Sequence, residues 1–234
     1  MPPMCYCHTT ARQCATRNLR FDTSIADLLV ASDMWKNRWS KRIVFLLCLA
    51  PFMMLVWRWT QHTLGINAVE AVARYTGDWT IRFMMLTLAV TPLRRLPGLN
   101  PLIGYRKMFG LFTFFYGLLH ALHYWAIDIQ WNMQILAEDL TIRRFFIAGM
   151  LSLVIMIPLA LTSTNAMIRK IGGKRWQMLH RLVYVSAIAG VIHYLWQGKT
   201  ATLDPILYAC LLALLLGARV VFRMIKRSPC TLIN

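Results

Sequence analysis

Acidic residues are scarce in this sequence, which holds 9 Asp and Glu against 26 Lys and Arg and has a formal net charge of +17. Charged residues of both signs make up 15% of the chain. A soluble globular domain usually has about 25%. Hydrophobic residues make up 58% of the chain and gather in long runs. This composition excludes an ordinary soluble domain and predicts a polytopic membrane protein.

The sequence also lacks the short motifs that mark common cofactor sites. It contains no CxxCH motif, so covalently attached haem is not expected, and no GxGxxG, P-loop or HExxH motif. Its six cysteines lie in the terminal segments or within apolar runs, and none lies in a loop that we expect outside the membrane. A disulfide framework is therefore not expected.

Six apolar runs are each close to the ~20 residues that cross the hydrocarbon core as a helix. They cover residues 43–60, 78–95, 106–127, 144–162, 178–197 and 203–222. The second run is the weakest, because Arg82 lies near one end and Pro92 near the other. The predicted fold is an all-α, polytopic six-helix transmembrane bundle within residues 41–225.

The basic residues alternate from loop to loop. Most of the 26 fall before the first run, after the second, after the fourth and at the C-terminal end, whereas the acidic residues lie mainly in the other loops. The positive-inside rule then predicts that both termini are cytoplasmic. The large positive charge is thus interpreted as a topology signal, and nucleic acid is not an expected partner.

The segments outside the bundle are expected to be tails. Residues 1–40 contain no hydrophobic stretch long enough for a signal peptide. They are interpreted as a cytoplasmic tail that is either disordered or the product of an over-extended gene start, since Met34 opens a short basic stretch before the first run. Residues 226–234 are expected to form a short cytoplasmic tail.

Three histidines, His120, His180 and His193, lie inside the apolar runs. Ionisable side chains in hydrocarbon are costly and mark candidate functional sites, and neutral imidazole is a common axial ligand of haem iron. His120 and His193 are expected at the same level of two parallel helices, in the outer half of the bilayer. One haem held between them is the favoured interpretation, and histidines that merely pack are the alternative.

The role of His180 stays open. It lies thirteen residues before His193, about 20 Å away along a helix and about 140° around it. Arg106 and Lys107 occupy its level on the third run, so a second haem would have one good ligand and one poor one. Arg82 is compatible both with neutralising a haem propionate and with extending to the membrane surface.

Several segments resemble a known family. They are TPL at 91–93, RKMFGL at 106–111, LLH at 118–120, LTSTNAM at 161–167, KRWQMLHRLVYV at 174–185 and IHYLW at 192–196. Together they resemble MsrQ (YedZ), the haem-binding membrane subunit family of the periplasmic methionine sulfoxide reductase system. MsrQ belongs to the wider ferric-reductase-like transmembrane group. The resemblance covers roughly residues 41 to 225.

The resemblance implies a multi-pass protein of the bacterial inner membrane that carries one or two b-type haems. Quinol would be the electron donor, and FMN is a further cofactor of the family, with a cytoplasmic flavin reductase as its source of electrons. The acceptor would be a periplasmic molybdopterin-containing methionine sulfoxide reductase, joined to this chain as a heterodimer. His120 and His193 match the family's outer ligands, His180 its inner histidine, and Arg106 a second inner ligand or propionate contact.

We therefore predict an electron-transfer subunit rather than a catalytic one. The chain is too short after the sixth run for a flavin or nicotinamide domain, so its electron donor is expected to be a separate molecule. Two alternatives remain open. One is a stand-alone transmembrane reductase of ferric or cupric chelates, and the other is a membrane haem-binding scaffold without turnover.

Overall fold

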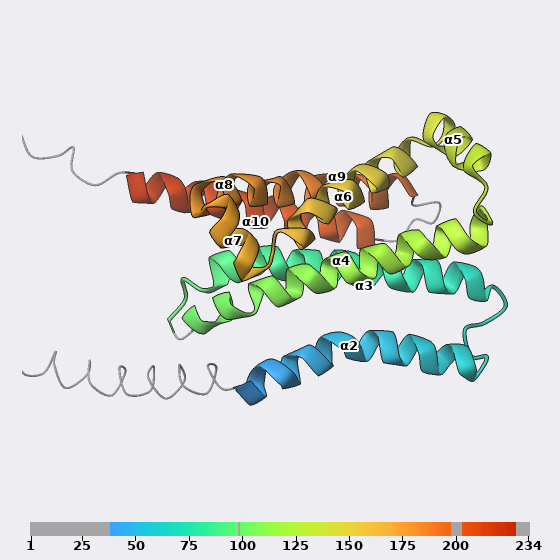
Figure 1. Ribbon diagram of the computed structural model, residues 1–234, viewed down its shortest axis with the longest axis horizontal. Coiled ribbons are helices and arrows are strands. Elements are labelled where there is room, and N and C mark those ends of the chain that lie inside the picture. The colour runs from blue at the N-terminus through green and yellow to red at the C-terminus, as the bar shows by residue number, and fades with distance from the viewer. Residues whose placement is uncertain (1–37, 98, 198–202, 228–234) are drawn as a thin grey trace, which may run out of the picture.

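The computed structural model describes residues 38–97, 99–197 and 203–227, and every regular element within these ranges is helical (Figure 1). The long helices are α2 (Arg38–Thr60), α3 (Ala68–Leu93), α4 (Arg106–His123), α6 (Arg144–Leu161), α9 (Val183–Gln197) and α10 (Asp204–Arg227). The shorter elements are η1 (Asn100–Gly104), a π-helical turn η2 (Tyr124–Asp128), α5 (Met133–Ile142), α7 (Asn165–Ile171), α8 (Gly173–Leu179) and a 3-10 turn η3 (His180–Leu182). The predicted tails lie mostly outside the described residues.

The all-α prediction is confirmed, and each predicted apolar run overlaps one long helix or, for the fifth, α8, η3 and α9 in succession, although α3 begins ten residues before the run 78–95. Four segments are long and apolar enough to cross a membrane, namely Arg38–Thr60, Arg144–Leu161, Gly173–Gln197 and Asp204–Phe222. The other two long helices are more polar, since α3 carries charged residues over its first half and α4 begins with two basic residues. The count of six spans therefore stays a prediction.

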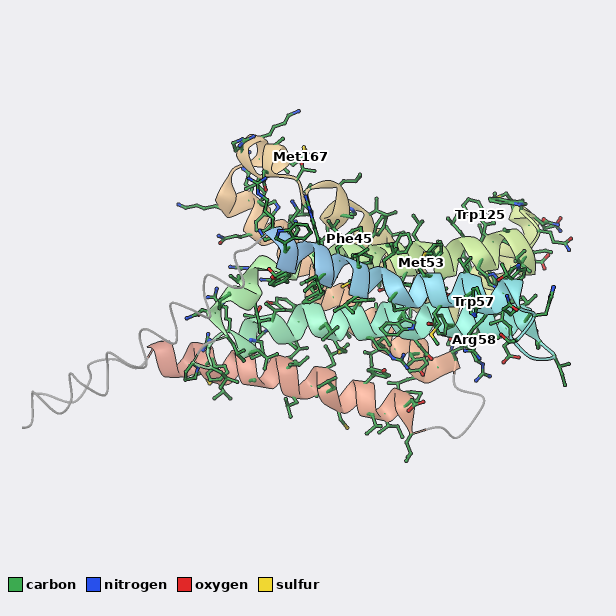
Figure 2. The ribbon with its side chains drawn as sticks, turned by 90° about the horizontal axis from the view of Figure 1, so that it is seen from below. Phe45, Met53, Trp57, Arg58, Trp125 and Met167 are labelled. Atoms are coloured by element: carbon green, nitrogen blue, oxygen red, sulfur yellow. The ribbon has the colours of Figure 1, made fainter. Side chains whose placement is uncertain are left out.

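The long helices lie side by side, and the N-terminal end of α2 and the C-terminal end of α10 lie at the same end of the bundle (Figure 1). We call this the α8 end, because α7 and α8 lie there, and the opposite end, capped by α5, the α5 end (Figure 1). Trp57 of α2 and Trp125 of η2 lie at the α5 end, far from Met167 of α7 (Figure 2). Tryptophans gathered at one end suit a membrane–water interface.

Two packed clusters hold the bundle together. The larger joins α3, α6, α9 and α10 through buried aliphatic and methionine side chains, with Leu88 and Ala187 fully buried. The smaller is largely aromatic and joins α2, α3 and α4 through Cys48, Phe83, Phe112 and Tyr116. Helices α3 and α4 therefore lie between α2 and the other long helices (Figure 1).

Proline 51 interrupts α2, and a tyrosine of α4 repairs the interruption. The Tyr116 hydroxyl donates to the Cys48 carbonyl oxygen at 2.9 Å and accepts from the Phe52 N–H at 3.1 Å. These two backbone groups would normally bond each other within the helix. In hydrocarbon, a backbone group freed by proline must find another partner, and Tyr116 provides it.

Helices α6 and α9 are joined by a reciprocal serine pair. The Ser152 hydroxyl donates to the Ser186 carbonyl oxygen at 2.9 Å, and the Ser186 hydroxyl donates to the Ser152 carbonyl oxygen at 3.0 Å. Small residues with interhelical hydrogen bonds allow membrane helices to approach closely. The pair lies about two turns from His193 and helps to set the spacing of α6 and α9 there.

Candidate functional site

His120 and His193 come together near the α5 end of the bundle. His120 lies in the last turn of α4 and His193 in the C-terminal half of α9. Their ring centroids are 6.2 Å apart, and the ring planes are inclined at 78°. The two imidazoles thus lie close together, and the helices that carry them run in the same direction through the bundle (Figure 1).

Each ring is oriented by a backbone carbonyl of a neighbouring helix. His120 Nδ1 lies 2.9 Å from the Ala73 carbonyl oxygen of α3, and His193 Nδ1 lies 2.7 Å from the Phe145 carbonyl oxygen of α6. Because a carbonyl oxygen can only accept, both Nδ1 atoms must carry the proton and donate. This tautomer leaves each Nε2 with a lone pair for a metal, and a hydrogen bond to the other nitrogen is the usual support of a metal-binding histidine.

Two glycines make room for these rings. A Cβ atom at Gly77 of α3 would lie 3.4 Å from the His120 ring, which is ordinary contact. A Cβ atom at Gly149 of α6 would lie 2.7 Å from His193 Nδ1 and 2.9 Å from its Cε1, which is too close. The position of the His193 ring therefore depends on glycine at 149.

The geometry suits one iron between two axial imidazoles. Imidazole nitrogens bind transition metals at about 2 Å, so two rings on opposite sides of one ion have centroids roughly 6 Å apart. The observed separation is 6.2 Å. Within the described residues, no group of three His, Cys, Asp or Glu side chains could hold a bare metal ion. Two histidines alone suffice where a porphyrin supplies the other four ligands, so the residues present fit haem.

His180 has a different environment, at the α8 end. Its Nε2 atom lies 3.2 Å from the Thr162 hydroxyl oxygen, and its ring lies 4.1 Å from the Trp176 ring. The Thr162 hydroxyl itself lies 2.6 Å from the Pro158 carbonyl oxygen, to which it must donate. His180 Nε2 is then the donor to Thr162, so its Nε2 is engaged whereas those of His120 and His193 are not.

The predicted angle of about 140° between His180 and His193 does not carry over directly to the structure. It assumed an ideal α-helix, whereas η3 tightens the chain at His180–Leu182. If each of the three residues of η3 turns the chain by about 120° rather than 100°, the angle between the two histidines falls to roughly 80°. This estimate places the two histidines closer to one face than an ideal helix would.

The two predicted arginines lie apart from the facing rings. Arg106 is the first residue of α4, at the α8 end, near enough to His180 for its charge to act on that imidazole. Arg82 of α3 is exposed, lies 5.0 Å from the centre of the Trp79 ring and donates to the Tyr208 hydroxyl of α10 at 3.3 Å. Arg82 therefore links α3 to α10 in this structure, and its predicted propionate contact stays a prediction.

Arg219 is a buried arginine that the sequence pattern did not single out from the other basic residues of the C-terminal end. It is 7% exposed, and its guanidinium donates to the Tyr184 hydroxyl of α9 and to the Leu88 carbonyl oxygen of α3. The sequence feature that could have indicated its burial is its position, directly after an unbroken apolar stretch and eight residues before the end of α10. Gly149 was also missed, because nothing in the local sequence shows what its missing side chain would meet.

The fold and the paired histidines define a helical membrane protein of the ferric-reductase-like class. Accordingly, the family model described as ferric reductase like transmembrane component matches residues 76–191. That range contains His120 and His180 and ends two residues before His193.

Individual relatives narrow the class further. A protein-methionine-sulfoxide reductase heme-binding subunit MsrQ from Azospira oryzae is 48% identical over 190 residues, which are 81% of this chain and 82% of the relative. The MsrQ subunit from Ralstonia nicotianae is 49% identical over 179 residues, 76% of this chain and 82% of the relative. The magnetosome protein MamZ of Magnetospirillum gryphiswaldense is 37% identical over 185 residues, 76% of this chain but 28% of that protein. The chain belongs to the MsrQ family of heme-binding subunits.

Proposed function

We propose that this chain is the haem-binding electron-transfer subunit of a bacterial methionine sulfoxide reductase system, with haem b held by His120 and His193. The observation that carries the proposal is the pair of facing rings 6.2 Å apart, each oriented through Nδ1 by a backbone carbonyl. The names of the MsrQ relatives support the cofactor and the system.

A haem held by His120 and His193 would supply one-electron chemistry. The residues of the chain hold and orient this group. The carbonyls of Ala73 and Phe145 hold each imidazole in the tautomer that offers Nε2. The close approach of Gly149 limits how far the His193 ring can move toward α6.

The proposed topology has six spans with both termini in the cytoplasm. The α8 end carries the basic loops around η1, α7 and α8, and these are the loops in which the positive-inside rule expects Lys and Arg. Helices α3 and α4 would be the two further spans, since they lie alongside the four more apolar ones (Figure 1). In this orientation, the facing histidines lie toward the outer surface of the inner membrane.

The proposed electron path runs from quinol in the membrane to a separate periplasmic partner. The partner would be the molybdopterin-containing methionine sulfoxide reductase, which would dock near the α5 end. An FMN cofactor with a cytoplasmic flavin reductase is the second proposed source of electrons. We propose one haem per chain, because His180 Nε2 at the α8 end is engaged with Thr162; a second haem held by His180 is the alternative that the haem count tests.

The test begins with the detergent-purified full chain from haem-replete cells. We expect a Soret band, a low-spin spectrum of the reduced protein and a measurable haem-to-protein ratio. Purified protein that lacks haem would overturn the proposal. The reduced protein is then mixed with the periplasmic molybdoenzyme and methionine sulfoxide. Rapid reoxidation that depends on both additions is expected.

Two outcomes of the same experiment would support other functions. Fast reoxidation by ferric or cupric chelates, with no stimulation by the molybdoenzyme, would identify a stand-alone metal reductase. Haem that is neither reduced by a quinol analogue nor reoxidised by any of these acceptors would identify a haem-binding scaffold.

A further inference from the structure

A groove with a volume of about 340 Å³ lies beside His120, between α2, α3, α4 and η2. Most of its lining is apolar, including Phe52 of α2, Leu122 of α4 and Ile127 of η2. Leu122 and Ile127 are 39% and 47% exposed, so the groove opens on the surface that would face lipid. Its volume is at the lower end of the ~300–1,000 Å³ of small-molecule sites.

Two polar side chains line the groove, Thr76 of α3 and His123 of α4. His123 Nε2 lies 3.0 Å from the Val69 carbonyl oxygen, so Nε2 carries the proton and donates. The same tautomer makes His123 Nδ1 a hydrogen-bond acceptor. The groove wall therefore includes a side chain that can accept a hydrogen bond from a hydroxyl group of a ligand.

The residues that line the groove include no Lys, Arg, Asp or Glu. A charged phospholipid head group would lose its hydration there without gaining a counter-ion, which is costly. An uncharged ring with hydroxyl groups would fit the apolar walls and satisfy His123. Such a molecule must also be soluble in lipid, because the groove opens toward the hydrocarbon.

The groove is separated from the candidate haem ligand by a single side chain. The Thr76 hydroxyl oxygen lies 3.4 Å from His120 Nδ1, and Thr76 is also part of the groove wall. Ala126 and Ile127 of η2, a π-helical turn, form part of the groove wall, and such turns occur often at functional sites. Trp57 and Trp125 lie at the same end of the bundle (Figure 2), as expected near the membrane surface.

We propose that this groove binds the head group of a lipid-soluble hydroquinone, with one hydroxyl donating to His123 Nδ1 and the apolar tail extending into lipid. The inference rests on the proposed function and adds to it the place where the donor binds. It puts the quinol at the His120 side of the bundle, in the outer half of the membrane, and away from His180.

The test uses the haem-loaded full chain in lipid nanodiscs and a photoreactive azidoquinone, followed by mass spectrometry of the labelled peptides. We expect the label in segments that line the groove, around 119–127 of α4 and η2 or 52–55 of α2, and protection by excess unlabelled quinone. Leu122→Trp should reduce this labelling about tenfold, because the indole fills the groove. His123→Leu should raise the quinone concentration for half-maximal protection roughly three- to tenfold, the usual effect of one lost hydrogen bond.

Leu118→Trp is the matched control, since Leu118 is an exposed leucine of the same helix, 37% exposed, that does not line the groove. Its labelling should equal that of the wild type. Protected label elsewhere, or equal labelling in the Leu122→Trp and Leu118→Trp variants, would overturn the groove assignment while leaving the haem proposal standing. A wild-type protein without a Soret band would overturn the proposed function, and labelling of the groove, which needs no haem, can still be measured in that case.

Discussion

Gly149 of α6 faces His193 of α9 so closely that an added Cβ atom would lie 2.7 Å from the ring nitrogen Nδ1. That nitrogen also donates to the Phe145 carbonyl oxygen, one turn earlier on α6. One face of α6 thus holds the His193 ring by a hydrogen bond and leaves room for it because Gly149 has no side chain.

The first prediction concerns this glycine. Gly149→Ala should displace the His193 ring from the site and reduce the haem-to-protein ratio several-fold, as measured by pyridine haemochrome. Gly77→Ala is the matched control, because its Cβ atom would lie 3.4 Å from His120 and can be accommodated. Full haem retention in Gly149→Ala, with an unchanged low-spin signal, would contradict the described packing.

The second prediction concerns the two ligands. His120→Ala and His193→Ala should each abolish the low-spin haem spectrum, because one axial nitrogen is then missing. His62→Asn is the control, since His62 lies outside the long helices at a φ of 52°, a conformation that asparagine tolerates. If both alanine variants kept the spectrum and the electron transfer, the ligand assignment would be refuted.

The third prediction concerns the number of haems. His180→Ala should leave the haem count and the low-spin spectrum unchanged, because His180 Nε2 is engaged with Thr162 rather than free for iron. The comparison variant is Thr162→Val, which removes the hydroxyl group that binds His180 Nε2 and leaves His180 in place. A count that fell from two haems per chain to one in His180→Ala would instead make His180 the ligand of a second haem.

The fourth prediction concerns the repair of α2 at Pro51. Tyr116→Phe should lower the free energy of unfolding by about 1–3 kcal/mol, because the Cys48 carbonyl and the Phe52 N–H lose their shared partner. Pro51→Ala should reduce this loss, since the helix can then close the bond between these two groups itself. Unfolding in detergent of the two single variants and the double variant measures the coupling, and additive effects would show that Tyr116 does not repair the helix.

The helices themselves could be predicted from the sequence. The predicted run 144–162 is observed as α6 at Arg144–Leu161, and the run 43–60 lies within α2. Such agreement is expected, because a lipid-exposed segment must satisfy all its backbone hydrogen bonds within itself and must be apolar over its length. Both requirements are local, so they can be read from consecutive residues.

The details at His180 could not be predicted in this way. An ideal helix was assumed from 178 onward, whereas the chain forms α8, the 3-10 turn η3 and then α9. Trp176 and Thr162 hold His180 at this turn, and Thr162 is eighteen residues away in the sequence. The contact with Thr162 comes from the end of α6, a different helix. The hydrophobic periodicity of residues 178–197 does not reveal such a contact.

The sequence by itself determined that this is a helical membrane protein, where its helices run, and that His120 and His193 are the candidates for one shared iron. The tertiary structure alone decided which nitrogen of each ring is free, that Gly149 makes room for His193, and that Arg219 is buried in the bundle. The hydropathy and charge of a segment decide whether it lies in lipid or in water, and both properties can be read from consecutive residues. Tautomers, close approaches and buried partners depend on atoms from other helices, which become neighbours only when the bundle is packed.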